Sequence, residues 1–360
     1  MKPLPALRPA KAATIRDVAA VAGVSAMTVS RVVNKEATVR EGTRDRVLAA
    51  IEQLNYSPNL AARMLTGAQQ IRIGLLFTNP SANYLSELLV GGVDMASQLN
   101  VQMIVQRCQP DDHTIAVARQ LIDGGVDGLM LPSPLCDSAE LIAAIVAEGV
   151  PALAIGSGMP SADLLAISID EFAAAQTMTR HILSLGHRRI GFVVGDPSHS
   201  ESARRLEGYR AAMCEAGIAV EERYVTQGQF TYRSGLEAAD VLLNLADPPS
   251  AIFASNDDMA AAIVSVAHRK LLNIPGDLTV CGFDDTALAT AIWPELTTIR
   301  QPIAEMARAG VELLNAEIRA RRSGHTSRAR HAILDHILVC RKSDGILLYR
   351  DGEAIAQTLE

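Results

Sequence analysis

The sequence predicts an α/β protein in which an all-α N-terminal part precedes two doubly wound parallel sheets. Helical periodicity dominates residues 14 to 57, whereas short apolar runs alternate with amphipathic helical stretches from Ile71 onward. Strands that alternate with helices form parallel sheets covered on both faces. The number of apolar runs, and a break near residues 156 to 163, indicate two sheets in tandem rather than one.

The first helix is expected to begin at Thr14, because Thr14 and Asp17 have the spacing of a capping box. Gly23 is expected to end this helix, since glycine turns sharply at little steric cost. Ser25 can then cap a second helix. The apolar face of the first helix would consist of Ile15, Val18, Ala19 and Ala22, and that of the second of Val29, Val32 and Val33.

Two short helices joined by a tight glycine turn, the second with a polar face, are the arrangement of a helix-turn-helix. The second helix of this motif lies in a DNA major groove. A third helix is expected from Arg44 to Leu54, with Thr43 as its cap. Its Val47, Leu48, Ile51 and Leu54 would close a small core over the first two helices.

A short segment after the third helix has the features of a weak helix. Pro58 interrupts the preceding helix, Asn59 can cap, and about two helical turns follow before Gly67. Because a helix this short is marginal alone in water, we expect it to become ordered only when it packs on something.

These residues resemble a known family. The pattern DVAxxAGVSxxTVSRVVN of residues 17 to 34, followed by NYxPNxxAxxL at residues 55 to 65, is similar to the DNA-binding headpiece and hinge of the lactose/galactose repressor (LacI/GalR) family of bacterial transcription factors. The resemblance implies a helix-turn-helix domain at residues 14–57, a hinge helix and linker at 58–70, and an effector-binding and dimerisation domain at 71–343. Residues 1–13 would be a disordered arm, and residues 344–360 a C-terminal extension without an assigned role.

The resemblance also implies which residues meet DNA. Ala26, Met27 and Arg31 would face base edges, and Arg31 is the best candidate for a bidentate contact with guanine. Leu65 would be a wedge in the minor groove, and two wedges require a homodimer on a near-palindromic operator. Ala26 and Met27 suit methyl contacts, which leaves the operator sequence open. The full expected set is Thr14, Ser25, Ala26, Met27, Thr28, Ser30, Arg31, Asn34, Asn59, Ala62 and Leu65, of which Thr28, Ser30 and Asn34 would mostly touch phosphate or fix the helix.

Charge is distributed unevenly along the chain. The whole chain has a net charge of −7, whereas residues 1 to 70 contain 10 basic and 5 acidic residues, a net charge of +5 that leaves −12 for the remainder. A basic end on an acidic body is expected when one end meets phosphate and the rest does not.

The remaining composition indicates a cytoplasmic protein without a membrane or a cofactor as partner. The five cysteines stand far apart, without a C-x-x-C pair, and are expected to be buried reduced thiols. No run approaches the ~18 apolar residues of a membrane span, and residues 1 to 13 lack the apolar core of a signal peptide. No metal site is expected, because His325, His331 and His336 do not have the spacing of metal ligands.

The alternation after residue 70 predicts individual elements. Buried strands are expected at 71–77, 101–105, 128–131, 152–155, 190–194, 251–254 and 278–281, and helices at 86–99, 112–123, 138–148, 171–185, 203–216, 232–245 and 257–270. Two facing sheets of this kind bind ligands in the cleft between them. The resemblance likewise implies a two-lobed body like that of periplasmic sugar-binding proteins, with one lobe of about 72–165 and 298–325 and the other of about 166–297 and 328–342.

Five residues lie at strand ends or in loops where the resemblance implies effector contacts: Tyr84, Arg205, Phe230, Asn256 and Asp284. The Arg205 guanidinium suits vicinal hydroxyls or a carboxylate, and Asn256 offers both a donor and an acceptor. Phe230 could stack on a ring, and Tyr84, expected in the first strand-to-helix loop, could close the cleft. The alternatives are that Arg205 pairs with Glu201 or Glu207, that Phe230 is core, that Asp284 or rather Asp285 caps a helix, and that Trp293 serves for packing.

The expected function is that of a repressor of carbohydrate-utilisation genes with a small sugar-like effector. Effector binding would close the lobes, change the separation of the hinge segments and so change DNA affinity. The alternative is a corepressor-activated regulator that responds to a purine or another non-sugar metabolite. An enzyme is not expected, because the chain lacks a G-x-G-x-x-G after the first strand, a P-loop and a G-x-S-x-G. An exported sugar carrier would have no use for residues 14–67.

Overall fold

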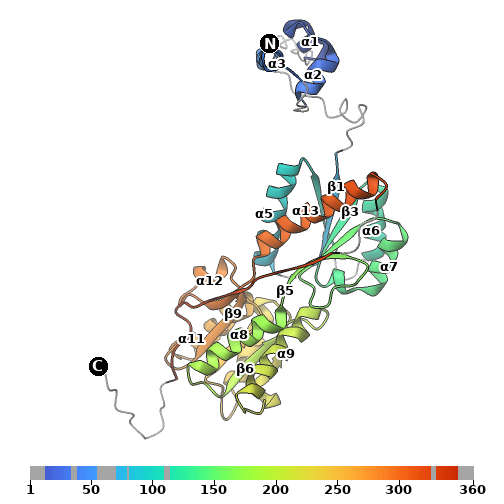
Figure 1. Ribbon diagram of the computed structural model, residues 1–360. Helices are drawn as coiled ribbons and strands as arrows, with labels where there is room; N and C mark the ends of the chain where they lie inside the picture. The colour runs from blue at the N-terminus through green and yellow to red at the C-terminus, as the bar shows by residue number, and fades with distance from the viewer. Residues whose placement is uncertain are drawn as a thin grey trace, which may run out of the picture. The chain divides into compact units, whose positions relative to one another are not determined.

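The computed structural model describes residues 13–33, 39–54, 70–78, 81–108, 114–325 and 330–347 (Figure 1). The chain divides into two compact units, Met1–Gln70 and Ile71–Glu360, which are described one at a time. The predicted fold class, with an all-α N-terminal part and two parallel-rich sheets, is confirmed.

The described part of the smaller unit contains three helices, α1 (Ile15–Ala22), α2 (Ala26–Val33) and α3 (Glu41–Gln53). Thr14 caps α1 as predicted, because its backbone N–H donates to Asp17 Oδ2 at 2.8 Å and its hydroxyl oxygen accepts from the Asp17 N–H at 3.4 Å. Gly23 ends α1 in the left-handed conformation, with a φ of 64°. The buried core comprises Val18, Ala19, Ala22, Val29, Val32, Val47 and Ala50.

Two expectations about α3 are wrong. The helix begins at Glu41, and its N-cap is Arg40, which makes no side-chain capping bond; Thr43 lies within the first turn. Leu48 is 50% exposed, and Ala50 takes its place in the core. The physical reason is the helical period: Ala50 lies three residues after Val47 and shares its face, whereas Leu48 is turned away by about 100°.

The described part of the larger unit contains two six-stranded sheets, each covered by helices on both faces (Figure 1). The first has the order β11-β5-β4-β3-β1-β2, and all its strands are parallel. Its strands are β1 (Arg72–Phe77), β2 (Gln102–Arg107), β3 (Gly128–Pro132), β4 (Ala152–Ile155), β5 (Leu165–Ile169) and β11 (His331–Leu334), and its helices are α5 (Ala82–Leu99), α6 (Thr114–Asp123), η1 (Leu135–Asp137), α7 (Ala139–Ala147) and α13 (Ile303–Arg322). We refer to this sheet and its helices as lobe 1.

The second sheet has the order β12-β10-β9-β8-β6-β7, in which β12 is antiparallel to β10 and the other pairs are parallel. Its strands are β6 (Ile190–Val194), β7 (Val225–Gln227), β8 (Ala251–Ala254), β9 (Thr279–Asp284), β10 (Thr297–Arg300) and β12 (Ile337–Val339). Its helices are α8 (Glu171–Ser184), α9 (Ser200–Glu215), η2 (Glu222–Tyr224), α10 (Tyr232–Leu243), α11 (Asp257–Arg269) and α12 (Leu288–Ala291). We refer to this sheet and its helices as lobe 2.

Within the described residues, the chain passes between the lobes three times, and the crossings differ from the expected bounds by a few residues. Residues 165–169 belong to lobe 1, because β5 pairs with β4, so the break at 156–163 joins neighbours in one sheet and does not divide the lobes. Residues 297–300 belong to lobe 2, because β10 pairs with β9. Residues 331–334 belong to lobe 1, because β11 pairs with β5.

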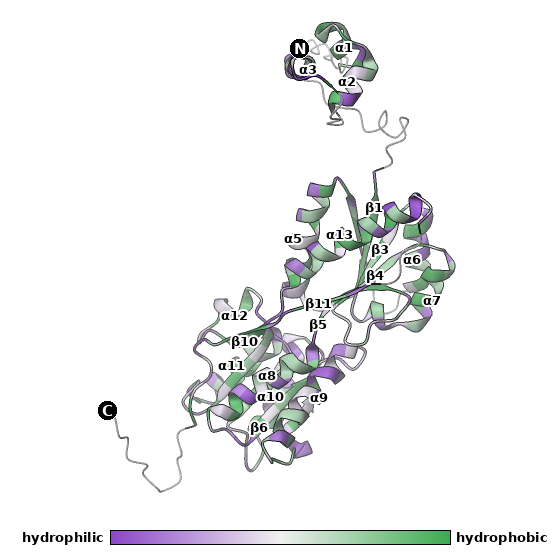
Figure 2. Cartoon of the chain, in the orientation of Figure 1, coloured by the Kyte–Doolittle hydropathy of each residue, from purple (hydrophilic) through white to green (hydrophobic). Residues whose placement is uncertain are grey.

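The cores lie between each sheet and its helices. In lobe 1, α5 and α13 cover one face and α6 and α7 the other; in lobe 2, α8 and α9 cover one face and α10 and α11 the other (Figure 1). Figure 2 shows how hydrophobic residues concentrate in strands such as β6, whose five residues are all buried. At Gly91, α5 approaches α13 so closely that an added Cβ would collide with the Ala304 carbonyl.

Three further expectations about burial are wrong. Trp293 is 75% exposed, so it does not serve to pack this chain's core. Cys214 and Cys340 are exposed, whereas the other three cysteines are buried as expected. The run that forms β2 is a strand, but as the edge of its sheet it is mostly exposed rather than buried. No described helix has the length and apolar character needed to cross a membrane.

Candidate functional site

Five of the predicted DNA-facing residues, Ala26, Met27, Thr28, Ser30 and Arg31, lie on α2; Ser25 lies directly before it, and Thr14 lies at the start of α1. Because Val29 and Val32 are buried, the neighbouring positions turn outward: Met27 is 66% exposed and Arg31 is exposed. Ala26, Thr28 and Ser30 are half-buried. The remaining predicted residues of this set, Asn34, Asn59, Ala62 and Leu65, lie outside the described residues.

Thr14 and Ser25 have local roles that fix the helices. The Thr14 hydroxyl donates to Asp17 Oδ2 at 2.7 Å. The Ser25 hydroxyl oxygen accepts from the Thr28 N–H at 3.2 Å and lies 2.9 Å from the Thr28 hydroxyl. Both side chains therefore hold the turns that set the direction of α1 and α2.

All five predicted effector residues line a single pocket of the larger unit. The volume open to water-sized molecules is about 20 Å³, and all of the space between the lining atoms, open solvent included, is about 390 Å³. The side chains come from both lobes and from the carboxyl ends of strands or the helix starts that follow them, as expected for facing parallel sheets. The lining consists of Tyr84, Arg205, Phe230, Asn256 and Asp284 together with Ser81, Ser133, Gly156, Glu171, His199, Glu201 and Gln301.

Arg205 on α9 is buried and held on three sides. Its Nε donates to Glu171 Oε2 at 2.7 Å, its NH1 donates to the Ser255 carbonyl at 2.5 Å, and its guanidinium carbon lies 3.7 Å above the Phe283 ring. Burial raises the pKa of Glu171, and the adjacent Arg205 guanidinium opposes that rise. The pair therefore holds the Arg205 guanidinium in one orientation in the pocket wall.

The two sequence-based alternatives for Arg205 are wrong. Glu207 pairs with the neighbouring Arg204 instead. Glu201 lies in the pocket but bonds to other groups: its Oε1 is 2.9 Å from His199 Nδ1, and its Oε2 accepts from the Ser133 hydroxyl at 2.7 Å.

Asp284 ends β9 with a φ of 109°, a conformation that side-chain-bearing residues rarely adopt. Gln301 Nε2 donates to its Oδ1 at 2.6 Å. Burial is the largest of the effects that raise the pKa of Asp284 well above its ordinary value. The expectation that Asp285 caps a helix is wrong, because its carboxylate pairs with Arg300 and Arg341 and the residue before α12 is Ala287.

Asn256 and Phe230 are bonded to each other. Asn256 caps α11, its Oδ1 accepting from the Met259 N–H at 2.9 Å, and its Nδ2 donates to the Phe230 carbonyl at 3.0 Å. Both groups that were expected to serve a ligand thus also hold the pocket wall. The Phe230 ring is 5.1 Å from the His199 ring, edge to face, and packs in the lobe 2 core while it lines the pocket.

Tyr84 lies in the first turn of α5 rather than in the loop before it. It is 9% exposed, and burial together with the nearby carboxylates raises the pKa of its hydroxyl well above the ordinary value. An added Cβ at Gly156, whose φ is 76°, would lie 3.0 Å from that hydroxyl. Tyr84 is therefore a lobe 1 side chain that lies near the carboxylates of Glu171, Glu201 and Asp284 in lobe 2.

Sequence reasoning missed six polar lining residues: Ser81, Ser133, Glu171, His199, Glu201 and Gln301. Four of them, Ser81, Ser133, His199 and Glu201, follow a predicted strand within seven residues, and this position is the signal that could have identified them. Glu171 and Gln301 were out of reach because β5 and β10, which precede them, were not among the predicted strands.

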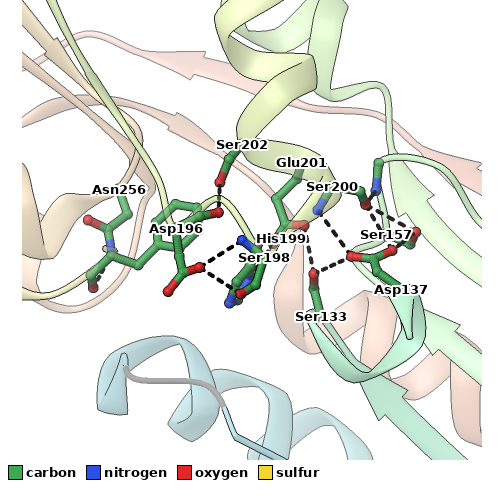
Figure 3. A network of polar contacts seen from close by, with 12 residues as sticks. Ser133, Asp137, Ser157, Asp196, Ser198, His199, Ser200, Glu201, Ser202 and Asn256 are labelled. Carbon is green, nitrogen blue, oxygen red and sulfur yellow. Dashed lines mark hydrogen bonds and ion pairs between the residues drawn. The ribbon is translucent and has the colours of Figure 1, made fainter. Parts of the chain in front are cut away.

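Direct hydrogen bonds join the lobes beside the pocket. Figure 3 shows Asp137 of lobe 1 facing the first turn of α9, where its carboxylate accepts from the Ser200 N–H at 3.1 Å and from the Ser200 hydroxyl at 2.9 Å. On the other side, Asp258 of lobe 2 accepts from the Ser81 hydroxyl at 2.6 Å and from Asn83 Nδ2 at 3.1 Å. The two lobes therefore form one bonded unit around the pocket.

Two buried acceptors in the lining have no hydrogen-bond partner among the described residues. They are Glu171 Oε1 and Gln301 Oε1, on side chains that are 3% and 4% exposed. A buried polar atom without a partner costs about 1 to 3 kcal/mol, so these atoms favour a ligand that donates hydrogen bonds. In the described part of the chain, no group of His, Cys, Asp and Glu is arranged to hold a metal ion.

Comparisons with known proteins match both units. Residues 14–59 match the family model of bacterial regulatory proteins of the lacI family, and residues 179–343 match that of a periplasmic binding protein-like domain. Catabolite control protein A of Priestia megaterium is 33% identical over 84% of this chain and 91% of its own length. The HTH-type transcriptional repressor PurR of Photobacterium profundum is 33% identical over 85% and 92%, and the ribose operon repressor of Escherichia coli is 32% identical over 84% and 92%.

Solved structures give the same result. The lac repressor dimer bound to operator and the anti-inducer ONPF is 29% identical and matches 93% of this chain and 100% of its own with a TM-score of 0.76. The complex of the transcriptional regulator CelR with cellobiose is 29% identical and matches 92% and 99% with a TM-score of 0.70. These relatives are regulators and not enzymes, in agreement with the sequence prediction. The chain therefore belongs to the lacI family of bacterial regulatory proteins and is a DNA-binding transcriptional regulator.

Proposed function

We propose that this regulator is a repressor of carbohydrate-utilisation genes that binds a near-palindromic operator as a homodimer and responds to a small sugar or sugar derivative. The observation that carries the effector part is the pocket, in which the five predicted residues lie beside two buried acceptors that have no hydrogen-bond partner among the described residues. Sugar hydroxyls can donate to such acceptors and accept from the Tyr84 hydroxyl and the Arg205 guanidinium. Two of the compared proteins, a ribose operon repressor and a regulator bound to cellobiose, have sugars in their names.

On the DNA side, α2 supplies the base contacts. Met27 is the most exposed hydrophobic side chain of the smaller unit's described part, and it would meet a thymine methyl group. Arg31, one turn further, would bind guanine, and Thr28 and Ser30 would touch phosphates. Leu65 and the other predicted hinge residues would enter the minor groove, one set from each chain of the dimer.

Coupling follows from the lobe-to-lobe bonds. A ligand that bonds to both lobes changes how firmly they are held together, and this alters the separation of the two hinge segments in a dimer. Linkage is reciprocal: a ligand that prefers the DNA-bound form raises DNA affinity, and one that prefers the other form lowers it. Induction by a sugar corresponds to the second case.

The experiment is a fluorescence-anisotropy titration of the full chain on a palindromic operator from its own upstream DNA, repeated with sugars, sugar acids and purines. We expect a sugar to lower operator affinity. A purine that raises affinity, with every sugar inactive, would replace this proposal with the corepressor alternative.

Arg31→Ala should lower discrimination at one operator position by about 1 to 3 kcal/mol. The matched control is Arg16→Ala, which removes the same charge from α1 and should leave base choice unchanged.

A further inference from the structure

The pocket wall contains more negative than positive side chains. Among the described residues, three carboxylates line it, those of Glu171, Glu201 and Asp284, and one guanidinium, that of Arg205. All four side chains are at least nine-tenths buried. A buried charge is costly without a partner, so each of the three carboxylates needs a positive charge or hydrogen-bond donors nearby.

Two of the carboxylates have a basic partner. Glu171 forms the ion pair with Arg205 at 2.7 Å. Glu201 uses both oxygens, one toward His199 Nδ1 at 2.9 Å and one for the Ser133 hydroxyl at 2.7 Å. The charge of Arg205 and the bonding capacity of Glu201 are therefore committed within the protein.

Asp284 is different. Its Oδ1 accepts from the Gln301 amide, and within the described part of the chain no Lys, Arg or His nitrogen forms an ion pair with it. The nearby arginines, Arg300 and Arg341, pair with Asp285 instead. Burial raises the pKa of this carboxyl, and the Arg205 guanidinium, which is paired with Glu171, opposes that rise only in part. A cationic ligand group would oppose it further.

The unpartnered acceptors point to the same kind of ligand. The amide nitrogen of Gln301 is bonded to Asp284, but its buried carbonyl oxygen has no hydrogen-bond partner among the described residues. One carboxylate oxygen of Glu171 is also buried and has no partner among these residues. Asp284, Gln301 and Glu171 all lie at the carboxyl ends of strands β9, β10 and β5. An ammonium group has three donors and no acceptor, so it matches acceptors that lack donors.

We propose that the effector is an amino sugar, whose ammonium group lies against Asp284 while its hydroxyls bond to the remaining polar lining. This inference rests on the proposed sugar response and specifies its chemical class. It predicts that the site prefers the protonated amine over the neutral hydroxyl or acetamido group at the same carbon.

The test is isothermal titration calorimetry of the full chain, in phosphate rather than an amine buffer and at a pH that keeps the amine protonated. The probes are D-glucosamine, D-galactosamine and D-mannosamine, each compared with its parent hexose and its N-acetyl derivative. We expect one amine to bind at least tenfold more tightly than both matched neutral sugars. The same amine should change operator affinity in the anisotropy assay.

Asp284→Asn should reduce that preference to less than threefold, because it removes the charge and keeps the shape. Glu237→Gln is the matched control: it removes the same charge from the exposed face of α10, where the side chain is 70% exposed, and should retain the preference. Thermal unfolding of both variants checks that they fold, and the comparison of sugars on the unaltered chain does not depend on either variant.

Each outcome separates the two proposals. If a neutral hexose binds as tightly as its amine and alters operator affinity, the amino-sugar inference is overturned while the sugar response stands. If only a purine acts, both fail. If an amine is preferred and Asp284→Asn keeps that preference undiminished, the assignment of the ammonium to Asp284 is overturned.

Discussion

The buried carboxyl group of Asp257 allows a quantitative prediction about stability. Asp257 is the first residue of α11 and is 1% exposed. Its Oδ2 accepts from the Thr286 N–H at 2.8 Å and the Thr286 hydroxyl at 3.1 Å, and its Oδ1 accepts from the Thr298 hydroxyl at 2.8 Å. Burial outweighs these bonds and raises its pKa from 3.8 to about 7.

The direction of the pH effect follows from proton linkage. Between the ordinary pKa of 3.8 and about 7, the folded chain keeps a proton that the unfolded chain has lost. The resulting stabilisation is fully present below the lower value and is lost as the pH rises through the upper one. Each tenfold difference in proton affinity is worth about 1.4 kcal/mol, so the interval corresponds to about 4 kcal/mol in the free energy of unfolding.

The informative change is Asp257→Asn, which resembles the protonated acid and cannot ionise. Its amide oxygen can accept the two bonds from Thr286, as the carboxylate does. Its amide nitrogen would donate to the Thr298 hydroxyl, which reverses the direction of that bond, and this hydroxyl can then donate to the Ile299 carbonyl 3.5 Å away. We expect the variant to match the parent near pH 4 and to exceed its stability at pH 8 by up to about 4 kcal/mol.

The assay is urea unfolding of the full chain at four pH values from 4 to about 8, followed by circular dichroism. Asp257→Ala is the control, because it also cannot ionise but leaves the threonine donors unpaired, at a cost of about 1 to 3 kcal/mol at every pH. If the parent and Asp257→Asn lose stability in parallel as the pH rises, Asp257 is not the titrating group and the reasoning is refuted.

Two further predictions concern the caps and the lobes. Thr14→Ala should destabilise the smaller unit by about 1 kcal/mol, measured by thermal unfolding, and weaken operator binding, measured by anisotropy. Glu52→Ala, on the exposed face of α3, is the control and should change neither quantity. If both variants lose stability and operator affinity equally, the capping role of Thr14 is contradicted. Asp137→Ala removes two bonds to Ser200 across the lobes and should increase the radius of gyration in X-ray scattering and weaken effector binding by about tenfold. Asp196→Ala, which loses bonds within lobe 2 only, is its control, and unchanged values for both variants would count against a role for these bonds.

Much of the fold was predictable because its signals are local. The capping box of Thr14 and Asp17 spans one helical turn, and the single residue Gly23 indicates where α1 ends. The seven predicted strands are apolar runs of four to seven residues, and each is present in the structure. The five pocket residues were named because they lie at strand ends or in loops where the family resemblance implies effector contacts, and the carboxyl ends of parallel strands meet at one edge of a sheet.

What could not be predicted depends on distant partners. β10 contains Thr297 and Thr298, two polar residues that are fully buried because their hydroxyls bond to Asp344 and Asp257. A hydropathy pattern does not reveal such a strand. Arg205 and its partner Glu171 are likewise 34 residues apart, which left the nearer glutamates as the only visible candidates.

The first turn of α11 explains how these parts act together. Because each helical residue is turned by about 100° from the last, successive side chains of this turn point in different directions. Asn256 lines the pocket, Asp257 is buried against β9 and β10, and Asp258 bonds across to Ser81 and Asn83 of lobe 1. Under the proposed function, we expect a ligand that moves Asn256 to shift Asp258 as well, because both belong to the same turn, and so to change the bonds of Asp258 to Ser81 and Asn83.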